Sequence, residues 1–437
     1  MPRRHFRYSK SKKQPRKPPK GPPPIRPGAD GSLKKVFAGI GVPPLKTFTP
    51  DSFQVNALEV IEHADCLVTA PTGAGKTWIA EQAIARIRKG GGKCWYASPL
   101  KALSNGKYTE FSKIFGSELV GILTGDRQEN PDAPIIVGTT EILRNQLYDA
   151  MHRGKSLATD FVILDEAHYL GDEDRGVVWE EIMIYLPTRI PLLLLSATIG
   201  NADQIASWLS SIRSTPCTVI EETVRPVPLF PLFFHPSGTL MPLTVADKEG
   251  QRPHLYKKVN RYIKSRYRRN FGHPRNLPPF DEILRVLRKY HLRPAIFFLK
   301  SRADCDRALD VCRGQLKFEK SSHGRLAPVI DEYIGHQPHI ANHRQRWHLE
   351  HLAVGAHHSG QLPSWKLVLE NLMTDGLLDA VFATSTVAAG VNFPARTVAF
   401  LNSDRFNGTQ FMTLTSTQLH QMTGRAGRRG MDKIGFA

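Results

Sequence analysis

Cysteine is scarce in this chain of 437 residues, and none of the five cysteines forms a CxxC pair. Their number and scatter exclude a disulfide framework and a thiolate zinc or redox site. Long hydrophobic runs are lacking too, since no apolar stretch approaches the roughly 18–20 residues that cross a bilayer. The basic amino-terminal segment has no apolar stretch of the kind found in signal peptides. We therefore expect a protein that makes no membrane contact, in a reducing intracellular compartment, most simply the cytoplasm.

Acidic residues are few relative to basic ones, with 40 Asp and Glu against 59 Lys and Arg and a net charge of +19. Residues 1–35 hold 12 of the basic residues and a single acidic one, Asp30. Residues 1–30 consist largely of Lys, Arg, Pro and Gly, a composition that cannot support a packed core. We expect residues 1–40 to form a flexible basic tail, either a phosphate-binding arm or a solubilising or targeting extension. The overall charge indicates a polyanionic partner.

Hydrophobic residues make up 41% of the chain, which is enough for real cores, and the length suggests two or three domains. From residue 48 to about 229, short apolar runs alternate with helix-like stretches. Runs this short and uniformly apolar are typical of strands buried on both faces of a parallel sheet with crossover helices. The runs are Cys66–Thr69, Cys94–Ala97, Ile135–Val137, Phe161–Leu164 and Leu192–Leu195.

A Pro-rich segment then interrupts the pattern, and its centre, Lys257–Arg275, has eight basic residues and no acidic ones. A second α/β pattern begins near Asp281, with a helix expected from Pro363. The sequence therefore predicts an α/β domain at 41–232, a basic linker with an insertion at 233–280, and a second α/β domain at 281–437. The apolar runs of the second domain are Ala295–Leu299, Leu352–Ala356, Ala380–Phe382 and Thr397–Leu401.

A phosphate-binding loop follows the first apolar run, with the sequence APTGAGKT at Ala70–Thr77. Gly73 and Gly75 let backbone N–H groups approach phosphate oxygens, and the following helix N-terminus favours an anion. Lys76 can reach the β- and γ-phosphates, and Thr77 can hold Mg²⁺. Ala70 replaces the usual first glycine, but strand, loop and helix follow in the right order. The loop predicts a nucleotide site.

The run Phe161–Leu164 ends in DEAH, at Asp165–His168. An acidic residue at the end of a neighbouring buried strand is well placed to hold Mg²⁺, which predicts Asp165 as the metal ligand. The adjacent Glu166 can orient or deprotonate the attacking water. Together the two motifs predict hydrolysis of a nucleoside triphosphate, with ATP and Mg²⁺ as cofactors.

Further polar turns follow other strands, and with them the chain resembles superfamily-two helicases of the DExH type over residues 45–437. The resemblance is closest to the Ski-two-like (superkiller-type) RNA helicases. It implies two tandem RecA-like domains and an ATP-dependent enzyme that moves 3′ to 5′ on a single strand and unwinds duplexes. Family members continue into winged-helix and ratchet domains, so we expect a chain that ends after the last motif to be truncated. The motifs that carry the resemblance are SPLKALSN, DEAHYLGDEDRG, SAT, RPVPL, GAHHSGQLP, GVNFPA and QMTGRAGRRG.

The resemblance also implies roles for individual residues. The nucleotide would be held by Phe48, Phe53, Gln54, Thr72, Gly73, Ala74, Gly75, Lys76, Thr77 and Gly390. The catalytic groups would be Lys76, Asp165 and Glu166, with Gln421, Arg425 and Arg428 reaching the γ-phosphate from the second domain. The strand backbone would be contacted, without base reading, by Pro99, Lys101, Asn105, Thr139, Thr140, Lys300, Ser301 and Thr386.

The segment Ser403–Thr415 contains Asn407-Gly408, a strong signal for a hairpin with a two-residue turn. It resembles the hairpin that family helicases insert at the duplex junction, where Phe406 and Phe411 would replace base stacking. The alternative is a surface turn whose phenylalanines pack on their own domain.

Several alternatives stay open. The sequence GRAGRRG resembles the RNA-processing branch, which favours single-stranded RNA over DNA as the partner. An RNA-stimulated ATPase that remodels RNA–protein complexes without unwinding is a second interpretation, and a non-catalytic RNA-binding scaffold is a third. The scaffold is disfavoured because all the catalytic residue types are present. Seven histidines in 336–358 predict a polar helix face and not a metal site. We expect a monomer, with protein partners from RNA processing.

Overall fold

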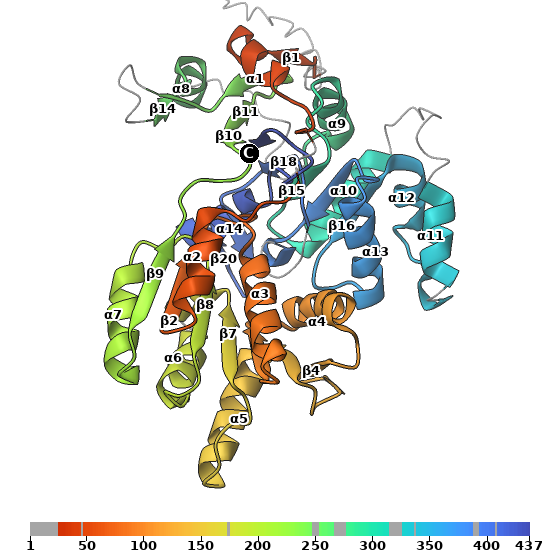
Figure 1. Ribbon diagram of the computed structural model, residues 1–437. Helices are drawn as coiled ribbons and strands as arrows, with labels where there is room; N and C mark the ends of the chain where they lie inside the picture. The colour runs from red at the N-terminus through yellow and green to blue at the C-terminus, as the bar shows by residue number, and fades with distance from the viewer. Residues whose placement is uncertain are drawn as a thin grey trace, which may run out of the picture.

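The computed structural model describes residues 25–44, 47–172, 175–246, 253–265, 277–313, 326–335, 338–387, 393–406 and 409–437. Two mainly parallel β-sheets form its centre, and helices cover both faces of each sheet (Figure 1). The predicted α/β fold with two sheets in series is confirmed.

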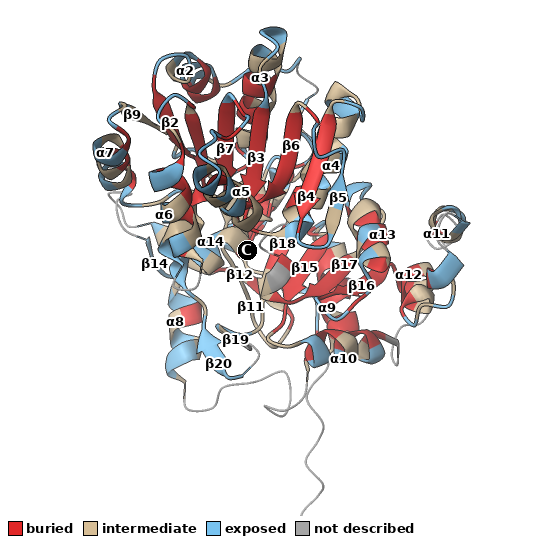
Figure 2. Cartoon of the chain, turned by 90° about the horizontal axis from the view of Figure 1, so that it is seen from below, coloured by how far each residue is buried: buried red, intermediate tan, exposed pale blue. Residues whose placement is uncertain are grey.

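The first sheet has eight strands in the order β5-β4-β6-β3-β7-β8-β2-β9. All neighbours are parallel except β5, which pairs antiparallel with β4 at one edge. The apolar runs become strands because each is buried on both faces, as Figure 2 shows. The strands are β2 Asp65–Thr69, β3 Cys94–Ser98, β4 Val120–Thr124, β5 Arg127–Glu129, β6 Ile135–Thr139, β7 Phe161–Asp165, β8 Leu192–Ser196 and β9 Cys217–Glu221.

Helices α2, α3 and α4 pack on one face of this sheet, where Phe53, Ile79 and Phe111 belong to one apolar core. Helices α5, α6 and α7 pack on the other face, with Leu143 and Trp179 in a second core. The helices are α2 Ser52–Val60, α3 Lys76–Lys89, α4 Lys101–Phe115, α5 Thr140–His152, α6 Gly176–Tyr185 and α7 Ala202–Arg213.

The second sheet has six parallel strands in the order β10-β21-β18-β15-β17-β16. Helices α9 and α10 pack on one face, and α11, α13 and α14 supply core residues on the other. The strands are β10 Leu229–Phe230, β15 Ala295–Phe298, β16 Val354–His357, β17 Ala380–Ala383, β18 Thr397–Phe400 and β21 Gly435–Phe436. The helices are α9 Phe280–Lys289, α10 Arg302–Arg313, α11 Leu326–Gly335, α12 Arg346–Leu352, α13 Pro363–Thr374 and α14 Ser416–Gly424.

The boundaries differ from those expected from composition. Residues 25–40, assigned to the tail, contain β1 (Gly28–Ala29) and α1 (Lys34–Ala38), and Leu33 is fully buried in the core of the second domain. Strand β10 pairs with β21, so the second sheet recruits chain from before residue 233. The segment expected to be a linker carries β11 Leu232–Phe234, β12 Thr239–Pro242, β13 Thr244–Ala246, β14 Pro253–Leu255 and α8 Lys257–Lys264.

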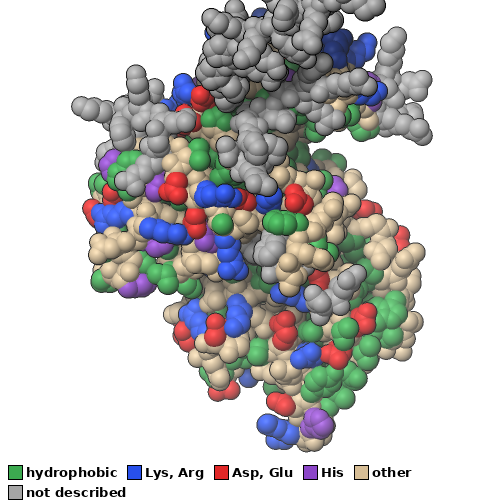
Figure 3. Space-filling view, turned by 180° about the vertical axis from the view of Figure 1, so that it is seen from behind, with side chains coloured by type: hydrophobic (Ala, Val, Ile, Leu, Met, Phe, Trp, Pro, Cys, Tyr) green, Lys and Arg blue, Asp and Glu red, His purple; other side chains and the backbone are tan. Residues whose placement is uncertain are grey.

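Hydrophobic side chains gather on the back of the first domain, over α6 and α7 (Figure 3). Val177, Ile184 and Ile212 are exposed there. Within the described ranges, no helix combines the length and apolarity needed to cross a membrane.

Candidate active site

The predicted nucleotide-binding motifs meet at the carboxyl edge of the first sheet. Strand β8 lies between β2 and β7, with Thr69 paired to Ser196 and Asp165 paired to Leu195. The loop after β2 and the DEAH segment after β7 therefore emerge at the same edge of the sheet, on either side of β8. In open α/β sheets this edge is where ligands bind.

The loop Ala70–Gly75 has the backbone of an anion cradle. Gly73 and Gly75 have φ values of +83° and +90°, in the left-handed region that favours glycine. No heavy atom lies within 4 Å of where a Cβ of Gly73 would sit, so that side of the loop is open. Since α3 begins immediately after the loop, its free N–H groups point at the same space.

Lys76 is partly buried at the start of α3. Its Nζ donates to the carbonyl oxygens of Ala70 at 2.7 Å and Pro71 at 3.2 Å. Burial lowers the pKa of Lys76, and the carboxylates of Glu166 and Asp165 oppose this shift. An incoming phosphate would supply the countercharge that favours the ammonium form.

Asp165 is fixed from two sides, because the Tyr96 hydroxyl donates to Oδ2 and the Glu166 N–H donates to Oδ1 at 2.9 Å. Burial raises the pKa of Asp165, and the charge of Glu166 acts in the same direction. Glu166 has a φ of +58°, an uncommon conformation for a residue with a side chain. Such strain clusters at functional sites.

The oxygen donors at this edge fit Mg²⁺, which favours hydroxyl and carboxylate oxygens and keeps several waters and phosphates. Thr77 Oγ1 and the Asp165 carboxylate are the groups that would hold it. Among the described residues there is no cluster of three or more His, Cys, Asp or Glu that could bind a metal by themselves.

Lys107, which the sequence analysis did not identify, also reaches this site. Its Nζ donates to Thr77 Oγ1 at 2.8 Å and to Glu110 Oε2 at 2.7 Å. Lys107 lies in the middle of α4, and no local motif marks it. Only the packing of α4 beside α3 brings it to Thr77.

Gln54 is buried beside the loop. Its Oε1 accepts from the Asp51 N–H at 2.8 Å and its Nε2 donates to the Gly75 carbonyl at 2.9 Å. Phe48 is 56% exposed, with its ring centroid 5.6 Å from that of Trp78, so these two rings offer a surface for a base. Phe53, predicted near the nucleotide, instead packs in the core of the first domain.

Groups from the second domain touch the first one at this site. The Gln421 amide contacts the His168 imidazole, and burial lowers the pKa of His168 to about 4. Arg429 donates to the Ala74 carbonyl at 2.9 Å. Arg425 is partly buried, and this desolvation lowers its pKa, while the charge of Glu166 opposes the shift.

Arg428, the third group expected at the γ-phosphate, is bound elsewhere in this structure. Its Nε donates to Asp432 Oδ2 at 2.7 Å and its Nη2 donates to Oδ1 at 3.0 Å, and Arg396 binds the same carboxylate. Arg429, which was not predicted, is the arginine that contacts the loop. Gly390 lies outside the described residues.

The predicted backbone contacts of the first domain fall in two groups. Lys101 and Asn105 lie on α4, where Lys101 pairs with Asp126 at 3.2 Å and Asn105 Oδ1 accepts from Arg127 at 2.7 Å. The Pro99 carbonyl accepts from Arg175, another cation that the sequence analysis missed. The remaining two residues are nearly buried: Thr139 and Thr140.

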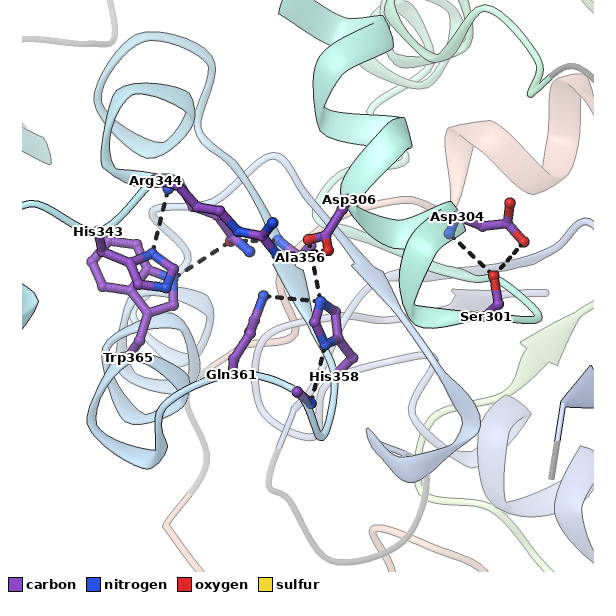
Figure 4. Close-up of polar contacts among 11 residues, drawn as sticks. Ser301, Asp304, Asp306, His343, Arg344, Ala356, His358, Gln361 and Trp365 are labelled. Atoms are coloured by element: carbon purple, nitrogen blue, oxygen red, sulfur yellow. Dashed lines mark hydrogen bonds and ion pairs between the residues drawn. The ribbon is translucent and has the colours of Figure 1, made fainter. Parts of the chain in front are cut away.

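In the second domain, Ser301 stands at the start of α10, where its hydroxyl donates to Asp304 at 2.7 Å. Figure 4 shows Asp306, on the same helix, pointing toward His358 after β16, and their side chains are 3.2 Å apart. The Gly360 N–H donates to His358 Nδ1, so this contact holds the HHSG turn in place. The Thr386 side chain lies outside what the structure describes.

The expected hairpin is present as β19 (Asp404–Phe406) and β20 (Phe411–Thr413), which pair antiparallel. Phe406 pairs with Phe411, so four residues and not two separate the strands; 407–408 are outside the described residues. The Phe411 side chain is 53% exposed, and the ammonium of Lys300 lies 4.9 Å from its ring centroid. The ring lies on the surface and contacts Lys300 of its own domain, so the insertion hairpin and the surface turn both stay predictions.

Comparison with known proteins agrees with this geometry. The family model described as DEAD/DEAH box helicase matches residues 51–205. A protein of Mycobacterium tuberculosis named probable helicase HelY is 39% identical over 413 residues, covering 89% of this chain and 45% of the relative. The human exosome RNA helicase MTR4 is 36% identical over 408 residues, covering 89% of this chain and 38% of the relative. Residues 51–205 thus match a DEAD/DEAH box helicase domain, and the chain as a whole is similar to Ski-two-like DExH helicases.

A further relative, the chloroplastic DExH-box ATP-dependent RNA helicase DExH15 of Arabidopsis thaliana, is 35% identical over 431 residues, covering 89% of this chain and 36% of the relative. The chain thus spans less than half the length of these relatives. The similarity includes both sheets, whereas the family model ends in α7 of the first domain.

Proposed function

We propose that this chain is the ATPase core of an RNA helicase, which binds ATP with Mg²⁺ between its domains and couples hydrolysis to 3′ to 5′ movement on single-stranded RNA. The observation that carries the proposal is the contact of Arg429 and Gln421 of the second domain with Ala74 and His168 of the first. The groups of the two domains that we propose to bind the nucleotide therefore lie at one site.

Hydrolysis is assigned to the residues of the sheet edge. Lys76 leaves the loop carbonyls to bind the β- and γ-phosphates. Thr77 and Asp165 would hold Mg²⁺, which would neutralise charge on the phosphate oxygens. Glu166 orients the attacking water and accepts its proton. Tyr96 keeps the Asp165 carboxylate oriented through its hydrogen bond.

Hydrolysis can be coupled to movement because each domain supplies part of the proposed nucleotide site. Arg425 and Arg429 come from the second domain, and we assign them, with Gln421, to the nucleotide phosphates and loop. Arg428 acts through its ion pair with Asp432, which fixes the turn after α14. ATP then favours domain closure and hydrolysis favours opening, so each cycle shifts the domains along a bound strand.

RNA is proposed as the strand because GRAGRRG resembles the RNA-processing branch and because two of the relatives are named as RNA helicases. Lys101, Asn105 and Ser301 offer ammonium, amide and hydroxyl groups, which suit phosphates and not bases. We therefore propose binding that is largely independent of sequence. An intracellular location is proposed because all five cysteines are free.

The test is the ATP hydrolysis rate of the chain alone, with single-stranded RNA, and with single-stranded DNA of equal length, beside a duplex-displacement assay. Stimulation by RNA with displacement supports the proposal. Stronger stimulation by DNA supports a DNA helicase. RNA stimulation without displacement supports a remodelling ATPase, and no hydrolysis in any condition supports a scaffold.

A further inference from the structure

A second lysine lies at the predicted Mg²⁺ site, and the proposed hydrolysis gives it no task. Helices α3 and α4 lie side by side (Figure 1), and Lys107 of α4 donates to Thr77 Oγ1 at 2.8 Å. Its ammonium also binds Glu110 Oε2 at 2.7 Å, and the side chain is only 14% exposed. Lys76, by contrast, is turned toward the carbonyls of its own loop.

The surroundings of Lys107 are acidic. Burial raises the pKa of Glu81 on α3, the charge of Glu110 adds to this rise, and Lys107 opposes it. Lys107 also opposes the rise in the pKa of Asp165, and its effect on that pKa is larger than the effect of Lys76. These effects place the ammonium among the carboxylates, where it adds to the positive charge of Lys76 and Arg425.

We propose that Lys107 is an internal counterion, which binds the Mg²⁺-holding hydroxyl of Thr77 in the nucleotide-free protein and withdraws to Glu110 when Mg²⁺ arrives with the nucleotide. This inference rests on the proposed function, because it assigns Mg²⁺ to Thr77 and Asp165. It makes Lys107 a positioning residue that sets the Mg²⁺ requirement of the site.

The physical reason is competition for one oxygen. Mg²⁺ binds oxygen at about 2.0–2.1 Å, so it and an ammonium on the same hydroxyl would lie roughly 4–5 Å apart and repel each other. Glu110 already accepts from Lys107, so the ammonium can leave Thr77 without losing its carboxylate partner. Glu110 is therefore the group that makes the exchange possible.

The experiment measures the Mg²⁺ concentration that gives half-maximal binding of a fluorescent ADP analogue, mant-ADP, to the whole chain. Lys107→Gln removes a competing cation, so we expect a requirement at least about fivefold lower than that of the unmodified protein. Glu110→Gln removes the carboxylate to which Lys107 withdraws, so we expect the requirement to rise by a similar factor. A purely structural role for this pair would raise the requirement in both variants.

Two controls and a second measurement complete the test. Lys107→Arg keeps the charge, and Lys113→Gln changes an exposed lysine of the same helix, so both should stay within about twofold of the unmodified protein. Without Mg²⁺ and nucleotide, Lys107→Gln should lower the thermal midpoint, because carboxylates lose their counterion, and Mg²⁺ with ADP should narrow that difference.

An unchanged or higher Mg²⁺ requirement for Lys107→Gln, or an unchanged or lower one for Glu110→Gln, overturns the inference. If Lys107→Gln does not fold, an unchanged or lower Mg²⁺ requirement for Glu110→Gln still overturns the inference. Binding of mant-ADP by the unmodified protein separates a failure of the proposed function from a failure of the role of Lys107. If it shows no Mg²⁺-dependent mant-ADP binding, the proposed function fails; if it binds and only the variants disagree, the role of Lys107 alone fails.

Discussion

Arg429 of the second domain donates a hydrogen bond to the carbonyl oxygen of Ala74 in the phosphate-binding loop of the first, at 2.9 Å. Its other terminal nitrogen lies 3.0 Å from Asp51, beside Gln54. One side chain thereby links the second domain to both the loop and the region proposed to bind the base. The same loop is close to α14 as well, since a Cβ on Gly424 would come within 2.8 Å of Thr72. The two domains therefore already touch where the nucleotide would lie.

The two arginines of the last motif should respond differently to removal. Arg425→Ala should lower the turnover number by about 10³-fold or more, the scale typical of an arginine that neutralises transition-state charge, with little change in the thermal midpoint. Arg428→Ala removes one of the two arginines that bind the buried Asp432 carboxylate and leaves Arg396 on it, so we expect about 1.5–3 kcal/mol of destabilisation, the scale of a lost hydrogen bond to a charged group.

Steady-state kinetics beside thermal unfolding separates these effects. The double variant Arg428→Ala, Asp432→Asn should be no more stable than Arg428→Ala, because Arg396 then also loses its carboxylate partner. If Arg428→Ala keeps its thermal midpoint and loses turnover as Arg425→Ala does, Arg428 acts directly on the phosphate and its pairing with Asp432 is secondary.

The hairpin phenylalanine Phe411 should matter for strand separation and not for stability, because its ring is on the surface. Phe411→Ala removes a stacking surface worth about 1–3 kcal/mol per base, so we expect duplex displacement to slow severalfold. RNA-stimulated ATP hydrolysis should stay near that of the unmodified protein. Met412→Ala, at the next position of β20, is the matched control. If both activities and the thermal midpoint fall together, the Phe411 ring stabilises the packing of its domain and does not separate strands.

The ion pair of Asp65 and Arg213 should stabilise the first domain. Both side chains are 1% exposed, and Arg213 also donates to the Leu186 and Ile190 carbonyls. Arg213→Ala leaves a buried carboxylate unpaired, so we expect a loss of about 3–5 kcal/mol, seen as a large drop in thermal midpoint. Glu62→Gln removes the exposed partner of Arg86 and should cost under about 1 kcal/mol. An equal loss of stability in Arg213→Ala and Glu62→Gln would contradict the larger contribution of the buried ion pair.

Stability should fall on acidification because two partly buried histidines, His168 and His343, have lowered pKa values. Burial lowers the pKa values of His168 and His343 to about 4, whereas in the unfolded chain they titrate near 6.5. Between pH 6.5 and 4 the unfolded state therefore binds more protons, and the unfolding free energy drops as pH falls, by at most about 3 kcal/mol for His168.

Thermal midpoints measured from pH 7 to 4 check this, with His343→Gln as the test variant because it lies outside the nucleotide site. Its midpoint should fall less steeply between pH 6.5 and 4 than that of the unmodified protein. A parallel or steeper fall would show that His343 is not neutral in the folded state.

The strands that could be predicted are those whose burial is continuous in sequence. Phe161–Leu164 lies within β7 because every side chain there is buried. Strand β4 escaped detection because Gly121 interrupts its apolar run, and glycine is needed there, since a Cβ would come within 2.0 Å of the Asn130 carbonyl. The sequence predicts a tail at residues 25–40 because the apolar residues there are isolated and show no helix or strand periodicity. In the structure one of them, Leu33, nevertheless anchors the segment in the core of the second domain.

In the candidate site, too, only the residues that a local sequence pattern places could be predicted. Lys76 and Asp165 could be predicted because strand, loop and helix order places them locally. The contact between Lys107 and Thr77 joins positions 30 residues apart on two helices and has no local signal. The pairing of Arg428 with Asp432 depends on a turn whose side-chain directions only the folded chain defines.

The most direct test of the account is the pair of substitutions at the sheet edge, measured by mant-ATP binding with Mg²⁺ and by ATP turnover with single-stranded RNA. Lys76→Ala should lose nucleotide binding, because its ammonium is the phosphate contact. Glu166→Gln should bind mant-ATP as the unmodified protein does but turn over at least about a hundredfold more slowly, the scale of removing a catalytic base. Near-normal turnover by Glu166→Gln, or normal binding and turnover by Lys76→Ala, would contradict the assignment of this edge as the ATP hydrolysis site.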